Sequence, residues 1–158
     1  MSLMYKTISQ YSFTPILAEE CTKDMQKTRI YKVFSDLGII GEGGIKDIYR
    51  MMQLIVQQDS ESKSYQLREV YLQMSAGIEQ DAKAIEQRVR RTTAKGIQNL
   101  ANLGIEDYYN EIFQSYCSSL FDFKEVRNEM NFIQGKSSYR GKINVRKFIE
   151  GLLYIVES

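Results

Sequence analysis

The chain has 158 residues, of which 43% are hydrophobic and 26% charged, which is typical of one globular domain. Lys and Arg number 21 and Asp and Glu 20, so the net charge of +1 indicates no overall preference for an anionic partner. Histidine is absent, which excludes histidine general bases, Ser-His-Asp machinery and histidine-containing metal sites.

Membrane insertion and secretion are not expected. No apolar run reaches the roughly 18 residues that would span a bilayer. The opening MSLMYKTISQ has no long apolar segment, so it does not resemble a secretory signal. The two cysteines, Cys21 and Cys117, are far apart and suit a reducing compartment, which favours the cytoplasm.

The first half of the chain predicts a tail followed by helices. Residues 1–22 contain the only proline, Pro15, and have no clear period, so they are interpreted as a tail or linker before a domain over 23–158. Helical spacing runs from Lys23 to Leu37 and stops at Gly38. The stretch IIGEGG lacks the G-K-[ST] of a phosphate loop and is interpreted as a flexible connection. A helix over 45–56 and a polar loop over 57–63 follow.

In the second half, polar residues predict where helices begin. The candidate N-caps are Ser64, Asp81, Asp107 and Asp122. The helix after Asp81 is the longest, with a predicted end at Gly104. A basic loop over 136–142 leads to a last helix that begins at Asn144. No convincing strand pattern is present, so the predicted fold is all-α, a bundle of six to seven helices.

The requirements of an enzyme are not met. The neighbouring carboxylates Glu106 and Asp107 would point apart on a helix rather than converge. No metal-ligand cluster or nucleophile–base pair stands out. We therefore expect no enzyme activity, no catalytic residue, no metal and no cofactor.

The predicted helix over about 82–103 has an apolar stripe and a basic one. Ile85 and Val89 lie on the inward stripe, while the opposite stripe supplies the candidate DNA-binding residues Lys83, Glu86, Gln87, Arg90 and Arg91, followed by Lys95. Basic side chains supply phosphate affinity, and Gln and Arg can read purine edges in the major groove. A solvated helix face would look the same, as would an all-α interaction module that binds an acidic protein partner. In the loop that follows, Lys142 and Arg146 either contact DNA backbone or are solvated.

Resemblance favours the DNA-binding interpretation. The stretch YLQMSAGIEQDAKAIEQRVRR, residues 71–91, resembles the DNA-binding helix-turn-helix of the bacterial sporulation master response regulator. The later stretches LGIEDYYNEIF and SLFDFKEVRNEMNFI look closer to the YcbB-type output domains of glutamine-metabolism response regulators. The resemblance covers roughly residues 27–156.

The resemblance implies a sequence-specific regulator of transcription, the output domain of a bacterial two-component system. It implies double-stranded DNA as the partner, a homodimer on DNA, and a receiver domain in the parent protein. The sporulation regulator's DNA-facing positions fall on Lys83, Glu86, Gln87, Arg90 and Arg91. That regulator has Arg at the position of Gln87 and His at that of Arg91, so its operator sequence is not transferable.

Overall fold

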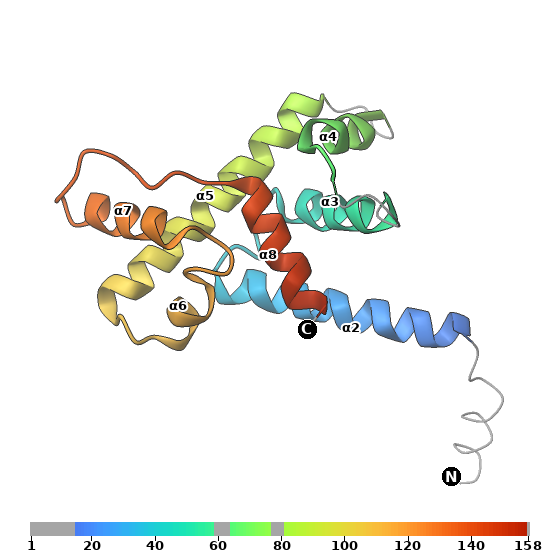
Figure 1. Ribbon diagram of the computed structural model, residues 1–158, viewed down its shortest axis with the longest axis horizontal. Helices are drawn as coiled ribbons and strands as arrows, with labels where there is room; N and C mark the ends of the chain where they lie inside the picture. Colours follow the sequence, from blue (N-terminus) through green and yellow to red (C-terminus); the bar gives the residue numbers. More distant parts are fainter. Residues whose placement is uncertain (1–14, 59–63, 77–80, 158) are drawn as a thin grey trace, which may run out of the picture.

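The computed structural model describes residues 15–58, 64–76 and 81–157, and in those ranges it contains seven α-helices and no strand (Figure 1). The all-α prediction is confirmed. The helices are α2 (Pro15–Asp36), α3 (Ile45–Gln58), α4 (Leu67–Ala76), α5 (Ala82–Glu106), α6 (Glu111–Tyr116), α7 (Phe123–Ile133) and α8 (Val145–Glu157). None of these helices has the length and apolar character of a membrane span.

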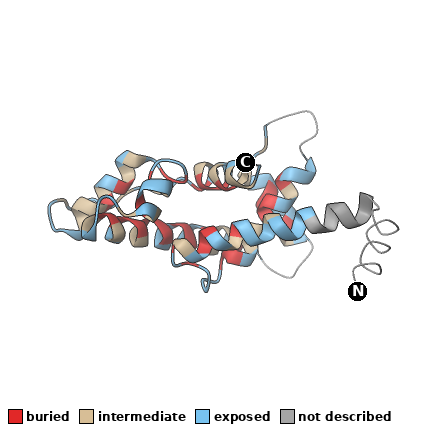
Figure 2. Ribbon diagram, turned by 90° about the horizontal axis from the view of Figure 1, so that it is seen from below, coloured by how far each residue is buried: buried red, intermediate tan, exposed pale blue. Residues whose placement is uncertain are grey.

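Helix α5 is the centre of the fold. It packs against α3, α4, α6, α7 and α8, while α2 packs against α8 on the other side of the core (Figure 1). The inward side chains Ile85, Val89 and Leu100 are fully buried. Figure 2 shows the same division along the helices, with buried residues facing inward and exposed residues outward. Burial of apolar side chains on α5 and on the five helices packed against it therefore fixes the position of α5.

Two of the predicted helix starts are confirmed. The backbone N–H of Lys83 donates to Asp81 Oδ1 at 3.3 Å, and that of Lys124 donates to Asp122 Oδ1 at 3.3 Å. Each aspartate satisfies a backbone donor that lacks a partner in the first helical turn. Helices α4 and α5 are consecutive and in contact, which is compatible with a helix-turn-helix. Its turn at residues 77–80 lies outside the described residues, as do residues 1–14 and 59–63 of the predicted tail and loop.

The predicted first helix ends as expected but begins earlier. It ends at Asp36, and Gly38 follows with a φ of +69°, the left-handed conformation that glycine adopts without penalty. The Gly38 N–H donates to Ser35 O at 3.0 Å and the Ile39 N–H to Phe34 O at 2.9 Å, which together form a Schellman motif. At its start, α2 already includes residues 15–22, so that part of the predicted tail is helical. Proline fits a first helical position, where no N–H partner is needed.

Three other predicted boundaries are wrong. Gly104 does not end α5, which continues to Glu106, because this glycine lies buried against the ring of Phe113. Asp107 is the C-cap of α5, and Asn110 caps α6 instead through a hydrogen bond from the Phe113 N–H. Helix α4 begins at Leu67, so Ser64 is too far upstream to be its N-cap.

Helices α3 and α5 are clamped together at the start of α3. The buried Gly44 N–H donates to Thr92 Oγ1 at 3.1 Å, and a side chain at position 44 would overlap α5. One turn along, Asp47 accepts two hydrogen bonds from Arg88, Nε to Oδ2 at 2.9 Å and Nη2 to Oδ1 at 3.2 Å. Gly44, the last residue of the glycine-rich stretch before α3, therefore allows the start of α3 to approach α5 closely, because glycine has no side chain.

Candidate nucleic-acid interface

The outer face of α5 presents the six residues of this helix that the sequence predicts to contact DNA. Five of the six are exposed and Glu86 is half-buried; the exposed residues are Lys83, Gln87, Arg90, Arg91 and Lys95. They lie opposite Ile85 and Val89, which anchor the helix in the core. The 3.6-residue period that the sequence showed therefore predicted both faces of this helix.

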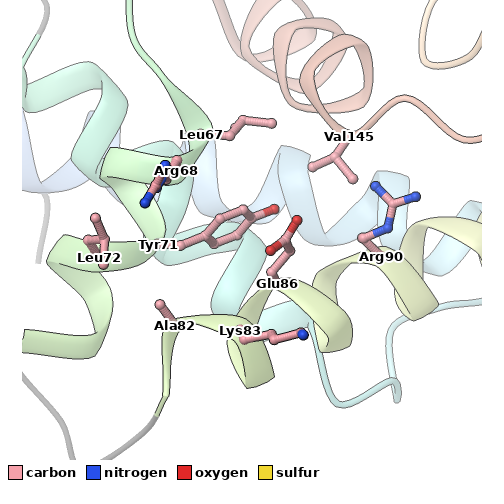
Figure 3. A pocket seen from close by; sticks show the side chains of 9 residues that line it. All are labelled: Leu67, Arg68, Tyr71, Leu72, Ala82, Lys83, Glu86, Arg90 and Val145. Atoms are coloured by element: carbon pink, nitrogen blue, oxygen red, sulfur yellow. The ribbon is translucent and has the colours of Figure 1, made fainter.

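Helix α4 supports the first two turns of α5 and leaves a hollow beside them. Residues from α4, α5 and the start of α8 line it: Leu67, Arg68, Tyr71, Leu72, Ala82, Lys83, Glu86, Arg90 and Val145. Figure 3 shows the Tyr71 side chain pointing toward the Glu86 carboxylate, with Arg90 beyond it. Burial and the nearby charge of Glu86 raise the pKa of Tyr71 to about 12, while Arg90 opposes this shift. Tyr71 is therefore an uncharged hydrogen-bonding group at neutral pH.

Arg90 joins this hollow to two others. One lies between α5 and the α7–α8 connection, and its cationic lining comprises Arg90, Arg91, Lys95, Arg140 and Lys142. The other, at the start of α8, is lined by the cations Arg90, Lys142, Arg146 and Lys147. Cations outnumber carboxylates in both linings. The three hollows, joined at Arg90, are called the groove below. The candidate residues Lys142 and Arg146 line it together with α5 residues.

The connection between α7 and α8 is fastened to α7 by two carboxylates. Glu125 Oε1 accepts the backbone N–H of Lys142 at 3.0 Å, and Glu129 Oε1 accepts that of Gly141 at 3.1 Å. The hydrogen bond from Lys142, followed by one from Asn128, holds the pKa of Glu125 below its usual range. The basic loop is therefore a fixed element, and it runs back along α5 (Figure 1).

Arg146 has several partners within the fold. Its Nε donates to Glu150 Oε1 at 3.2 Å and its Nη1 to the Tyr65 carbonyl at 2.9 Å. Its guanidinium also lies 4.4 Å from the centre of the Tyr65 ring. The side chain lines the groove, but it also connects α8 to the segment before α4. If Arg146 contacts DNA, it has a structural role as well.

Not every charged side chain of α5 faces the groove or pairs along the helix. Arg88 faces α3 and pairs with Asp47, with side-chain exposures of 26% and 13%. Glu86 and Arg90 have the spacing of an ion pair one turn apart. The described residues contain no such ion pair: their four salt bridges involve Lys32, Arg88, Arg140 and Arg146.

Three cationic residues that line the hollows were not among the candidates: Arg68, Arg140 and Lys147. Arg140 belongs to the basic loop over 136–142, and what distinguishes it from the other cations of that loop is its partner Glu129, 11 residues earlier. No group of three or more His, Cys, Asp or Glu could hold a metal ion in the part of the chain described. The groove offers guanidinium, ammonium and amide donors, which suit a polyanion.

The fold and the groove define the class: an all-α domain built around one long helix with a cationic outer face. Residues 29–152 match the YcbB domain family, and the chain belongs to that family. It is also 30% identical over 134 residues to the transcriptional regulatory protein GlnL of Bacillus subtilis (strain 168). The matched region covers 74% of this chain and 43% of GlnL. The chain thus spans less than half the length of this relative. No solved structure matches significantly.

Proposed function

We propose that this chain is the DNA-binding output domain of a two-component response regulator and that it controls transcription. The observation that carries the proposal is the groove in which the exposed face of α5 and the α7–α8 connection meet at Arg90. The family membership and the name of the matched relative, a transcriptional regulatory protein, support it. A receiver domain in the parent protein, a cytoplasmic location and a homodimer on DNA belong to the same proposal.

In this proposal the first half of α5 enters the major groove. The N-terminal residues of a recognition helix enter the groove, and here Lys83, Glu86, Gln87, Arg90 and Arg91 face the bases or the adjacent phosphates. Gln87 is suited to adenine N6 and N7, and Arg90 to guanine O6 and N7. Burial of Ile85 and Val89 on the opposite face keeps these side chains directed outward.

The remaining cations contact the sugar-phosphate backbone. Lys95 lies farther along α5, and Lys142 lines the same hollow from the α7–α8 connection. Arg146 lines the hollow at the start of α8, together with Arg90. Backbone contacts fix the orientation of a protein on the duplex without reading sequence. Arg146 would make such a contact with the part of its guanidinium that Tyr65 and Glu150 leave free, because Nη1 and Nε already donate to these two residues.

The experiment selects duplexes bound by the chain from a random pool and then compares the selected site with scrambled DNA at fixed salt. Arg90→Ala is expected to cost about 1–3 kcal/mol on the selected site and much less on scrambled DNA. Thermal unfolding checks that the variant is folded. Equal losses on both duplexes would make Arg90 a backbone contact, and an empty selection would favour an interaction module for an acidic protein.

A further inference from the structure

Residues 140–142 face α5 across a hollow, and Glu129, the one carboxylate among the described residues that line it, is covered by hydrogen-bond donors. We propose that Arg140 and Lys142, with Arg91 and Lys95 of α5, form a preformed site for a backbone phosphate of DNA. This inference rests on the proposed function and gives its backbone contacts at Lys95 and Lys142 a defined site, which Arg140 and Arg91 complete. It assigns Arg140 a binding role.

The four cations share one hollow. Arg91 and Lys95 are one turn apart on the exposed face of α5, and Arg140 and Lys142 come from the opposite wall. All four residues are exposed, so their charges are accessible to a ligand. A phosphodiester carries a single negative charge and accepts several hydrogen bonds, and guanidinium and ammonium groups provide matching donors.

Glu129 orients Arg140. Its side chain is only 2% exposed and accepts Arg140 Nη2 at 2.8 Å and Arg140 Nε at 3.4 Å, as well as the Gly141 N–H. The carboxylate lines the hollow but is covered by these donors, which neutralise it toward a ligand. Arg140 keeps a side-chain exposure of 55%, so the rest of its guanidinium is open to a second acceptor.

The backbone around Arg140 is fixed as well. The Arg140 guanidinium lies 4.8 Å from the centre of the Phe132 ring, which supports one of its faces. A side chain at Gly141 would overlap the Glu125 carbonyl, so glycine allows the connection to approach α7 closely. Glu125 then holds the Lys142 N–H. Since folding already orders the Arg140 guanidinium and the backbone at Lys142, these two groups lose little further entropy when a phosphate binds.

The test measures binding of the full chain to the selected duplex and to a scrambled duplex by fluorescence anisotropy over a range of salt concentrations. Arg140→Ala is expected to weaken both duplexes alike and to reduce the slope of log Kd against log salt by about 0.9, which corresponds to about eightfold in affinity at 0.1 M salt. Arg127→Ala is the matched control. It removes an equal charge from an exposed position of α7 that does not line the hollow, and it should leave the slope unchanged.

Glu129→Gln separates positioning from net charge. The substitution removes a negative charge, so a net-charge effect alone would tighten DNA binding. The proposal expects weaker binding, because Arg140 loses the ion pair that orients it. Arg140→Lys, which keeps the charge but loses the planar fork, should be intermediate, and it decides the matter if Glu129→Gln fails to fold.

The outcomes distinguish the two proposals. If Arg140→Ala behaves like Arg127→Ala, or if Glu129→Gln tightens binding, the phosphate site is refuted while the recognition role of α5 stands. If the unaltered chain shows no salt-dependent affinity for any duplex, the proposed function itself fails. An Arg140→Ala loss confined to the selected duplex would also refute the phosphate site, because a backbone contact does not read sequence.

Discussion

Arg88 lies among the cations of α5, yet the structure predicts that its removal will affect folding and not DNA binding. Its two hydrogen bonds to Asp47 clamp α5 to α3, and its side chain lines none of the three hollows. Arg90, two residues on, is exposed and lines all three hollows. Arg88→Ala and Arg90→Ala therefore remove the same charge from the same helix with opposite expected consequences.

The magnitude follows from the geometry of the pair. Hydrogen bonds to charged groups typically contribute about 1.5–3 kcal/mol, and partial exposure of this pair places its coupling near the lower end, about 1–2 kcal/mol. In a domain of this size, 1 kcal/mol shifts Tm by about 2–4 °C. Arg88→Ala should therefore lower Tm by several degrees, since it also leaves Asp47 without this partner.

The assay is a double-mutant cycle of Arg88→Ala and Asp47→Ala, followed by thermal or urea unfolding, together with DNA binding at several salt concentrations. The double variant should be more stable than the sum of the two single losses predicts. The salt slope of DNA binding should match that of the unaltered chain. A reduced slope, or unfolding losses that simply add, would refute the assignment of Arg88 to the core clamp.

Three further predictions concern single substitutions. Gly104→Ala should destabilise the fold by about 1–3 kcal/mol in urea unfolding, because overlap with Phe113 outweighs the gain in helix propensity, and a stabilised variant would contradict that packing. Gln87→Arg should shift base preference toward guanine at one position of the selected site, since it restores the residue of the resembling sporulation regulator, and an unchanged preference in a repeated selection would place Gln87 away from the bases. Tyr116 has a pKa raised to about 12 by burial and by its hydrogen bond to Asp36, so its stabilising contribution is complete below pH 10 and is lost as pH rises toward 12. Tyr116→Phe should flatten the fall in stability over that range, and an unaltered pH profile would show that this hydroxyl does not contribute.

The sequence predicted those features whose causes are local. Asp81 and Asp122 precede apolar helical patterns, and a capping hydrogen bond spans only two residues, so both helix starts could be located. The outward direction of Lys83 and Arg90 likewise follows from the helical period around Ile85.

The features it missed depend on contacts between distant residues. Gly104 looked like a helix end, but its role is to admit the Phe113 ring from the next helix. Nothing in the sequence distinguishes Glu129 from the other acids, and its buried position depends on its contacts with Arg140 and Gly141. Which arginines of a charge run are free for a ligand also depends on partners that sequence does not reveal, as with Arg88.

The length of α5 has a consequence for how the molecule approaches its target. Its 25 residues extend about 37 Å, with Lys83 near one end and the acids Glu106, Asp107 and Glu111 at or just beyond the other. A net charge of +1 exerts almost no long-range pull on a duplex, but such a separation of charge makes the molecule a dipole. Under the proposed function, the field of the DNA exerts a torque on this dipole and turns the cationic end toward the duplex before contact. Productive encounters then depend on orientation rather than on overall attraction, and added salt would reduce the rate of association by weakening this alignment.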